Sequence, residues 1–346
     1  MSVNIYDVAK RAGLSVVTVS RVLNNSPKVR DYNRQKVLKA MAELDYKPNA
    51  AARNLAKGDT GMIGLVLPAV DDPFISQVLF AVERAVRERG MFLVTAFAAS
   101  DEELSHANPG RMFLENRVDG ILILSPIISE EYILELKKNR FPFVLLDQHH
   151  SAVQAPSVTV DNFYGGYQAT ASLIAGGVKR IAHISGSTIY ESSVQRLEGY
   201  KQALRDYGLH IDEELIAAGN FSVESGYKAM MGWIELGKIP EAVFAADDNT
   251  AFGVMDAASK HKIAIPTELA LIGYDDHPFG SMLHPALSTV RQPTAALGKQ
   301  GVDLLLNVLA GKIKRAVTIT LKPEVVLRET TRAINRPSCD PNYSVS

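Results

Sequence analysis

The chain has 346 residues, 47% of them hydrophobic and 22% charged, which is typical of a soluble protein with two or three domains. No apolar run approaches the roughly 18 residues that cross a bilayer, the N-terminus lacks the pattern of a secretory signal, and the single cysteine, Cys339, excludes an internal disulfide, so we expect a cytoplasmic protein. The net charge of −1 hides a basic segment, because residues 1–57 hold eleven Lys and Arg against four acids (+7) and the remainder carries −8.

The first predicted elements are two short helices. Apolar residues recur at helical spacing in 5–12 and in 16–23. Gly13 allows the chain to turn between them, and Ser15 is a suitable N-cap for the second helix. This is the pattern of a helix-turn-helix, whose second helix enters the DNA major groove. An ordinary helical hairpin is the alternative, and the basic setting of the segment disfavours it.

A third amphipathic helix, predicted at 31–44, can close a three-helix core, and we assign residues 1–47 to this DNA-binding head. Residues 48–60 form the predicted connection to the rest of the chain. Their stretch 49–58 is rich in alanine, begins with an N-cap residue and ends with glycine, so it can form a two-turn helix. Helices this short are marginal in water, so we expect either a plain linker or a linker that folds on DNA.

Residues 61–332 alternate short apolar strands with amphipathic helices, which predicts an α/β body with parallel sheets covered on both faces. Two such series in tandem predict two lobes with a ligand cleft between them. The tail, 333–346, has no apolar period, and we expect it to be disordered. Strands are predicted at 62–67, 92–96, 120–124, 143–146, 157–160, 180–184, 214–218, 242–245, 270–273, 288–290 and 316–321. Helices are predicted at 74–88, 111–116, 130–138, 164–174, 195–206, 222–236, 250–260 and 297–309.

Eight short motifs are spread over residues 4–332. They are Ile-Tyr-Asp-Val-Ala at 5–9, Gly-Leu-Ser-Val-Val-Thr-Val-Ser-Arg at 13–21, Tyr-Lys-Pro-Asn-Ala-Ala-Ala-Arg-Asn-Leu at 46–55, Gly-Leu-Val-Leu-Pro at 64–68, Val-Asp-Gly-Ile-Leu at 118–122, Arg-Leu-Glu-Gly-Tyr at 196–200, Gly-Tyr-Asp-Asp at 273–276 and Leu-Ser-Thr-Val-Arg-Gln-Pro at 287–293. In these motifs the chain resembles the lactose repressor/galactose repressor (LacI/GalR) family of bacterial transcription regulators. The resemblance implies a helix-turn-helix head, a hinge helix and a two-lobed, periplasmic-binding-protein-like effector domain.

The resemblance assigns DNA contacts to the head and the hinge. Val16, Val17 and Arg21 would face base edges, since arginine is the usual bidentate donor to guanine and valine methyl groups pack on thymine. Leu55 would wedge apart a base step in the minor groove, and Leu55→Ala should therefore weaken operator binding. The remaining candidates are Tyr6, Thr18, Ser20 and Asn24 for phosphates, with Arg53 and Asn54 beside Leu55.

The resemblance also places a small-molecule site between the lobes. Arg196 and Asp275 can together bind vicinal hydroxyl groups, although a helix-surface cation and a loop cap are the plain alternatives. Several acids against one cation disfavour a phosphorylated effector and favour a neutral sugar, polyol or nucleoside. Tyr190 stands where the family's purine-binding branch has arginine, which weakens a purine hypothesis. The full set of candidates is Asp72, Phe74, Asp147, Asp161, Tyr190, Ser192, Arg196, Phe221, Asp247 and Asp275.

One helix-turn-helix covers only half of a palindromic operator, so a homodimer on pseudo-palindromic double-stranded DNA is expected. Helix 74–88, with Val78, Leu79, Val82 and Val86, is predicted to lie near the dimer face. Ligand binding between the lobes would change operator affinity through the hinge. The default expectation is a repressor that a sugar releases from DNA. The sequence does not decide whether the ligand weakens or strengthens operator binding.

Three alternative functions can be compared with features of the sequence. A catabolite-control regulator of the same family, which answers to a phosphocarrier protein, would share the head but need no tight sugar site. A periplasmic sugar-binding protein would lack the basic head. The chain shows no phosphate loop, zinc-ligand helix or nucleophile elbow, so we expect neither an enzyme nor a cofactor. The pairs His149-His150 and Asp247-Asp248 lack the spacing of metal ligands, so we expect no metal.

Overall fold

The computed structural model describes residues 3–23, 26–46, 59–68, 70, 72–97, 118–124, 130–148, 153–313 and 315–332. The chain forms two compact units, Met1–Gly61 and Met62–Ser346. The predicted helix 111–116, hinge residues 48–58 and tail 333–346 lie outside the described residues.

The first unit opens with helix α1 (Ile5–Ala12), whose two ends are fixed by local hydrogen bonds. The Asn4 side chain accepts from the backbone N–H groups of Tyr6 and Asp7, and the Asp7 carboxylate accepts from the Asn4 N–H, which completes a capping box. Gly13 ends the helix at φ 65°, a left-handed conformation that a residue without Cβ adopts at low cost.

Helices α2 (Val16–Leu23) and α3 (Asp31–Glu43) complete the head. The Ser15 hydroxyl caps α2 by accepting from the Thr18 N–H at 3.2 Å. Small and branched residues fill the space between the three helices, as the helical spacing predicts. The buried set is Val8, Ala9, Ala12, Val19, Val22, Val29, Val37 and Ala40.

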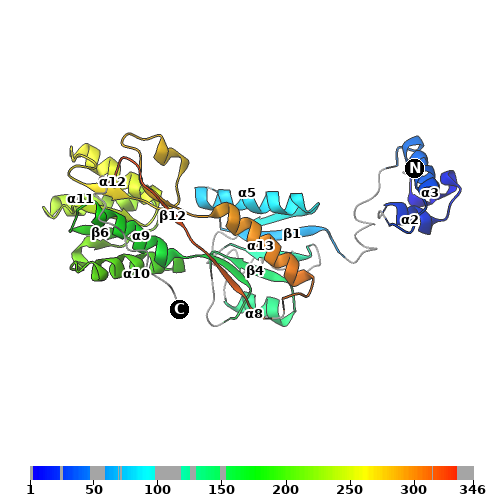
Figure 1. The fold of residues 1–346 in the computed structure, drawn as a ribbon, viewed down its shortest axis with the longest axis horizontal. Helices are drawn as coiled ribbons and strands as arrows, with labels where there is room; N and C mark the ends of the chain where they lie inside the picture. The colour runs from blue at the N-terminus through cyan, green and yellow to red at the C-terminus, as the bar shows by residue number, and fades with distance from the viewer. Residues whose placement is uncertain are drawn as a thin grey trace. The chain divides into compact units, whose positions relative to one another are not determined.

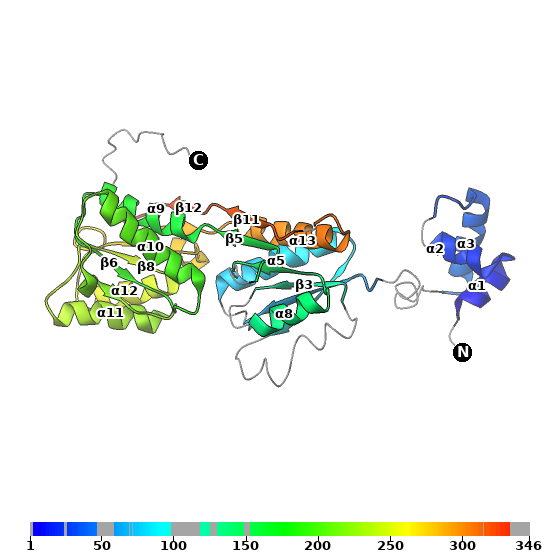
Figure 2. The ribbon, with the colours of Figure 1, turned by 90° about the horizontal axis from the view of Figure 1, so that it is seen from below.

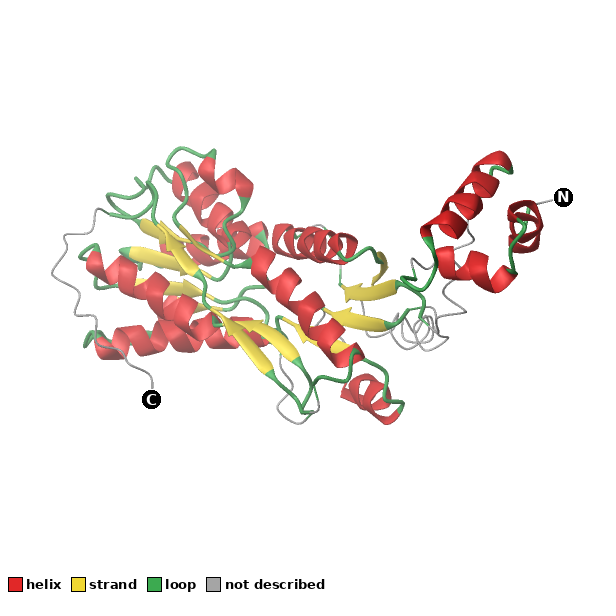
Figure 3. Cartoon of the chain, turned by 45° about the vertical axis from the view of Figure 1, so that its right-hand side comes forward, coloured by secondary structure: helices red, strands yellow, loops and turns green. Residues whose placement is uncertain are grey.

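The second unit contains two parallel sheets, each covered by helices on both faces (Figure 3), and a separate antiparallel pair of strands. In lobe 1, six parallel strands lie in the order β11-β5-β4-β3-β1-β2. The parallel arrangement explains why several of these strands are continuously apolar, since both of their faces are buried. The strands are β1 (Met62–Leu67), β2 (Phe92–Phe97), β3 (Gly120–Ile123), β4 (Phe143–Leu146), β5 (Ser157–Val160) and β11 (Thr318–Leu321).

Alternate residues of the lobe 1 strands enter different cores. Leu65 and Leu122 pack with helices α5 (Pro73–Glu88) and α13 (Thr294–Leu309) on one face. Ile121 packs with α8 (Glu130–Lys138) on the other. Figure 2 shows the sheet between these two helical layers.

Lobe 2 repeats this layering around the parallel sheet β7-β6-β8-β9 (Figure 1). Helices α9 (Asn162–Ala175) and α10 (Glu191–Asp206) cover one face, and α11 (Val223–Glu235) and α12 (Asp248–Lys260) cover the other. The remaining elements are β6 (Ile181–Ile184), β7 (Ile216–Ala217), β8 (Ala242–Ala245), β9 (Ala270–Ile272), the antiparallel pair β10 (Thr289–Arg291) and β12 (Glu324–Val326), and the short helices η2 (Glu213–Leu215) and η3 (Pro278–Ser281).

The chain passes between the lobes three times: from β5 to α9, from β10 to α13, and from β11 to β12. Helix α13 and strand β11 therefore belong to lobe 1 although they follow lobe 2 in sequence. The predicted strands and helices of the described body form within a few residues of their expected bounds. Strand β12 was not predicted.

That helix 74–88 lies near the dimer face stays a prediction, but its four apolar residues pack inside lobe 1. Val78, Val82 and Val86 of α5 are buried, and Leu79 packs against the same core of lobe 1. The apolar stripe of α5 faces its own sheet and α13, so it is not available to a partner. The exposed apolar residue of this helix is Phe80, at 70% exposure. No helix within the described ranges is long and apolar enough to cross a membrane.

Candidate functional site

The exposed face of α2 carries some of the predicted DNA-contacting residues. Val17 is 59% exposed, and the Arg21 side chain is exposed with no partner among the described residues. Arg11, by contrast, forms an ion pair with Glu43 at 2.5 Å. Within the described part of the head, Arg21 is thus an unpaired guanidinium beside an exposed valine, a combination that can read a guanine and a thymine methyl.

The other predicted DNA-contacting residues of the head differ in how exposed they are. Val16 is half-buried and packs against the head core, so the expectation that both valines point outward holds fully only for Val17. The Thr18 hydroxyl lies 2.9 Å from that of Ser15, within the cap of α2. Tyr6 is 70% exposed on α1, and Ser20 is half-buried. Asn24, Arg53, Asn54 and Leu55 lie outside the described residues, and their roles stay predictions.

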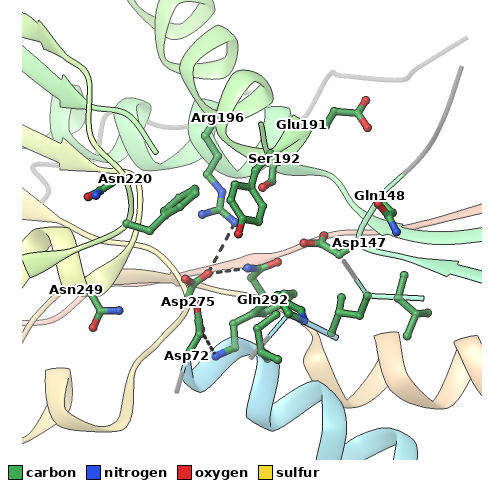
Figure 4. Close-up of a pocket in the computed structure, with 17 residues that line it drawn as sticks. Asp72, Asp147, Gln148, Glu191, Ser192, Arg196, Asn220, Asn249, Asp275 and Gln292 are labelled. Carbon is green, nitrogen blue, oxygen red and sulfur yellow. Dashed lines mark hydrogen bonds and ion pairs between the residues drawn. The ribbon is translucent and has the colours of Figure 1, made fainter. Parts of the chain in front are cut away.

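A cavity of about 390 Å³ lies between the lobes of the second unit (Figure 4). Its volume is in the range of small-molecule sites. Of the ten predicted ligand residues, eight line it: Asp72, Phe74, Asp147, Tyr190, Ser192, Arg196, Phe221 and Asp275. The other lining residues were not predicted, namely Pro68, Ile75, Leu124, Leu146, Gln148, Glu191, Asn220, Asn249 and Gln292. Several of these follow the carboxyl ends of strands, which is the signal that could have found them.

Arg196 is the central cation of the cavity, and it is only 3% exposed. Its Nε donates to Asn162 Oδ1 at 2.9 Å, and its Nη1 donates to the Ala246 carbonyl at 2.6 Å. Its Nη2 lies 3.8 Å from Asp275 Oδ1, and the guanidinium stacks 3.6 Å from the centre of the Tyr274 ring. The protein itself therefore holds the guanidinium in one orientation.

Asp275 is held from the other side. Its Oδ1 accepts from Gln292 Nε2 at 2.6 Å, and its backbone has a φ of 100°. Burial raises the pKa of Asp275 to about 7, against the lowering effect of Arg196. At neutral pH this carboxyl group can therefore both donate and accept hydrogen bonds, as a hydroxyl-bearing ligand requires.

Asp147 projects into the cavity from the end of β4, with a backbone φ of 53°. Burial raises its pKa to about 7, while Arg196 and the Asn162 side chain oppose that shift. Its Oδ1 is buried without a hydrogen-bond partner in the described part of the chain. A buried acceptor without a partner is costly, and a ligand donor would remove that cost.

An aromatic pair forms part of the wall on the lobe 2 side. The Tyr190 and Phe221 rings meet edge to face with their centres 5.4 Å apart. The absence of a side chain at Gly186 makes room for Phe221, because a Cβ there would lie 1.9 Å from the ring. Burial raises the pKa of Tyr190, and Asp72 of lobe 1 contributes to the same shift. Tyr190 of lobe 2 and Asp72 of lobe 1 thus line the same cavity.

The remaining two candidates have structural roles. Asp161 caps α9 by accepting from the Tyr164 N–H at 2.9 Å, and Asp247 caps α12 by accepting from the Thr250 N–H at 3.0 Å. Neither lines the cavity. The described residues contain no group of three or more His, Cys, Asp and Glu side chains that could hold a metal ion.

Comparison with known proteins places both units. Residues 4–49 match the family model described as bacterial regulatory proteins, lacI family, and residues 170–331 match a periplasmic binding protein-like domain. Catabolite control protein A of Priestia megaterium is 33% identical over 336 residues, which cover 96% of this chain and 100% of that protein. The HTH-type transcriptional repressor PurR of Vibrio atlanticus is 34% identical and covers 96% of this chain and 99% of its own length. The crystal structure of the lac repressor dimer bound to operator and the anti-inducer ONPF superposes with a TM-score of 0.85 at 28% identity, covering 96% of this chain and 100% of that one.

Proposed function

Because this chain belongs to the LacI family of bacterial regulatory proteins, we propose that it is a transcriptional repressor whose operator affinity is set by a small, hydroxyl-bearing ligand in the inter-lobe cavity. The ligand carries no phosphate, and a sugar fits the cavity best. The regulator acts as a homodimer on a pseudo-palindromic operator. It works on the chromosome, so we place it in the cytoplasm with the nucleoid.

One combination of features carries this proposal. The same chain holds a helix-turn-helix with an exposed valine and an exposed arginine, and a separate cavity whose aromatic pair and acids suit a sugar ring. Aromatic rings cover the apolar C–H face of a sugar, while carboxyl and amide groups bind its hydroxyls.

The lobes offer a route for control. Asp72 and Phe74 come from lobe 1, whereas Tyr190, Phe221 and Asp275 come from lobe 2. A ligand that contacts both sets binds best at one separation of the lobes. The ligand therefore shifts the protein population toward that separation of the lobes. If operator DNA binds best to protein with a different separation, linkage requires the ligand to change the affinity for operator.

The DNA-binding part is tested by selecting binding sites for the full chain from a library of random duplexes. We expect a two-fold symmetric sequence. Arg21→Ala should lower the affinity for the selected site by roughly 5- to 150-fold, which is the value of one bidentate base contact. It should leave the affinity for random DNA almost unchanged. Arg11→Ala is the control, since Arg11 is paired with Glu43. Equal losses of Arg21→Ala on selected and random DNA would contradict a base-reading role.

The ligand-binding part is tested by a thermal-shift screen of the full chain against sugars, amino sugars, polyols, nucleosides and sugar phosphates. A ligand found in this screen should bind Phe221→Ala roughly tenfold more weakly than the parent, because the variant lacks the aromatic face. Phe279→Ala, an exposed aromatic residue away from the cavity, is the control. No small-molecule hit, but stabilisation by a phosphorylated carrier protein, would favour the catabolite-control alternative.

A further inference from the structure

Two buried amide side chains hold the charged pair of the cavity from two of the crossings between the lobes. Asn162 begins α9 at the first crossing, Gln292 follows β10 at the second, and they are 3% and 4% exposed. Asn162 Oδ1 accepts from Arg196 Nε at 2.9 Å. Gln292 Nε2 donates to Asp275 Oδ1 at 2.6 Å (Figure 4). The pair of Arg196 and Asp275 is therefore fastened to both crossings.

Asn162 has the further property that its hydrogen bonds reach both lobes. Its Nδ2 donates to the Val160 carbonyl, at the end of β5, at 3.2 Å. Burial raises the pKa of Asp147, and a hydrogen bond from the Asn162 side chain acts against that shift. An amide has one oxygen acceptor and two N–H donors. In Asn162 the oxygen serves Arg196 of lobe 2, while the N–H groups serve Val160 and Asp147 of lobe 1.

Asn162 acts from behind the wall of the cavity. The residues that line the cavity include Arg196 and Asp147 but not Asn162. The oxygen and the nitrogen of its amide already have partners in the protein. Its contribution is therefore the orientation of two side chains that face a ligand, one from each lobe.

The bonds of Asn162 depend on the angle between the lobes, because the residue lies where the chain leaves lobe 1 for lobe 2. Motions of one lobe against another are absorbed by a few residues at the ends of elements such as these. A rotation carries Arg196 with lobe 2 and Asp147 with lobe 1. Hydrogen bonds weaken steeply when their geometry departs from the optimum, so the amide bonds both residues well over a narrow range of angles.

We propose that Asn162 is a positioning residue for ligand control: it holds Arg196 of lobe 2 and Asp147 of lobe 1 in register, and thereby ties ligand binding to the angle between the lobes. A ligand that contacts both residues favours the angle at which the amide bonds both. Without the amide, the angle is less defined and the same ligand binds more weakly. The inference rests on the proposed function and deepens it, because it names the residue that links the ligand to the lobes.

The test measures the distance between the lobes, which requires no ligand. Spin labels are attached to exposed positions of α8 and α11 through Lys138→Cys and Glu235→Cys in a Cys339→Ser chain, with one labelled protomer per dimer. Pulsed electron spin resonance gives the distribution of distances between the labels. We expect Asn162→Leu, which keeps the side-chain shape without its polar atoms, to broaden this distribution. A ligand found in the thermal-shift screen should also bind this variant about tenfold more weakly.

A matched control separates positioning from the general stability of α9. Thr170 is fully buried on the same helix, does not line the cavity, and donates from its hydroxyl to the Gly166 carbonyl. Thr170→Val therefore removes a buried hydrogen bond and should leave the distribution as in the parent. The unfolding transition of buried Trp233 checks the folding of each variant. Asn162→Asp keeps an oxygen for Arg196 but loses the N–H groups that face lobe 1, so it should broaden the distribution too, and it decides the test where Asn162→Leu does not fold.

Each outcome of these measurements decides the matter. A broader distribution in the Asn162 variants, with Thr170→Val like the parent, supports the inference. An unchanged distribution in the Asn162 variants overturns it, and so does equal broadening in Thr170→Val, because the cause is then weaker packing of α9. Parent-like ligand affinity in Asn162→Leu overturns the link to ligand binding. A screen that finds no ligand contradicts the proposed function, while the distances between the labels still decide the role of Asn162.

Discussion

Replacing Arg196 with methionine should destabilise lobe 2 strongly at pH 8. Methionine keeps much of the side-chain volume but removes the charge and the donors. Asp275 then loses its cation, and Asn162 Oδ1 and the Ala246 carbonyl lose donors at 2.9 and 2.6 Å. Removing one partner of a buried ion pair costs about 3–5 kcal/mol, and we expect a loss of that size in the free energy of unfolding.

The size of this loss should depend on pH. The pKa of Asp275 is raised to about 7 in the folded protein, from an ordinary value near 3.8. Its carboxyl is therefore largely protonated at pH 5 and carries little charge for Arg196 to match. Above pH 7 it ionises, and its burial without Arg196 becomes costly. The destabilisation by Arg196→Met should accordingly be smaller at pH 5 than at pH 8.

The chain provides its own reporter for this measurement. Trp233 is the single tryptophan, it is 4% exposed, and it packs in the core of lobe 2. Urea unfolding followed by its fluorescence therefore reports lobe 2. Arg205→Met is the matched control on the same helix, because Arg205 is exposed. It should change the free energy of unfolding by less than about 0.5 kcal/mol.

The double variant Arg196→Met with Asp275→Asn isolates the charge effect. It should recover part of the lost stability at pH 8, since the buried carboxylate without a cation is gone. The reasoning would be refuted by a loss below about 1 kcal/mol at pH 8, or by a double variant less stable than the sum of the two single changes predicts.

Three further predictions concern other parts of the molecule. Between pH 5 and 8, Asp147→Asn should become about 2 kcal/mol more stable relative to the parent. The reason is that a folded-state pKa of about 7 makes the parent lose stability as pH rises. The Trp233 urea assay checks this, and a difference in unfolding free energy that stays constant with pH would contradict it. Gly199→Ala should cost about 1–3 kcal/mol in the same assay, because a Cβ would lie 2.2 Å from the Phe163 carbonyl oxygen of α9, whereas Gly232→Ala, with no atom within 4 Å, should cost nothing. Asn4→Ala should remove about 1 kcal/mol of head stability, seen as roughly fivefold faster amide hydrogen exchange in α1 with no change in α12; unchanged exchange would show that the capping box contributes nothing.

The local pattern of apolar and polar residues predicted most of the helices and strands that the structure describes. Residues 62–67 and 242–245 are continuous apolar runs, and both form strands buried on both faces. Helix α10 begins at Glu191, four residues before its expected start, because the Glu-Ser-Ser segment resembles a loop when its helical neighbours are unknown. Strand β12 was missed because three residues after Pro323 carry no pattern, and its partner β10 lies far back in the sequence.

The cavity was predictable in outline but not in its electrostatics. Residues after the strand ends of the two sheets converge on the cleft between the lobes, so Asp147 of lobe 1 and Asp275 of lobe 2 could both be expected at the cavity. What could not be expected is that Arg196 is already bound by Asn162 and Ala246, or that Asp147 Oδ1 has no partner in the described structure. Those facts depend on which backbone groups lie within 3 Å after folding, and sequence spacing does not specify them. Residues 47–58 and the tail lie outside the described structure.

The order in which lobe 1 is assembled has a consequence for synthesis on the ribosome. Its edge strand β11 and its covering helix α13 come after all four large helices of lobe 2. While residues 294–321 are still inside the ribosome, α5 alone of the two helices covers one face of lobe 1, and the edge of β5 has no partner strand at β11. Apart from its last strand, β12, the C-terminal lobe thus has all its elements before the N-terminal lobe does, the reverse of the usual order during translation. A nascent chain halted near residue 290 would expose an apolar face and an open strand edge, both of which are binding sites for chaperones and starting points for aggregation.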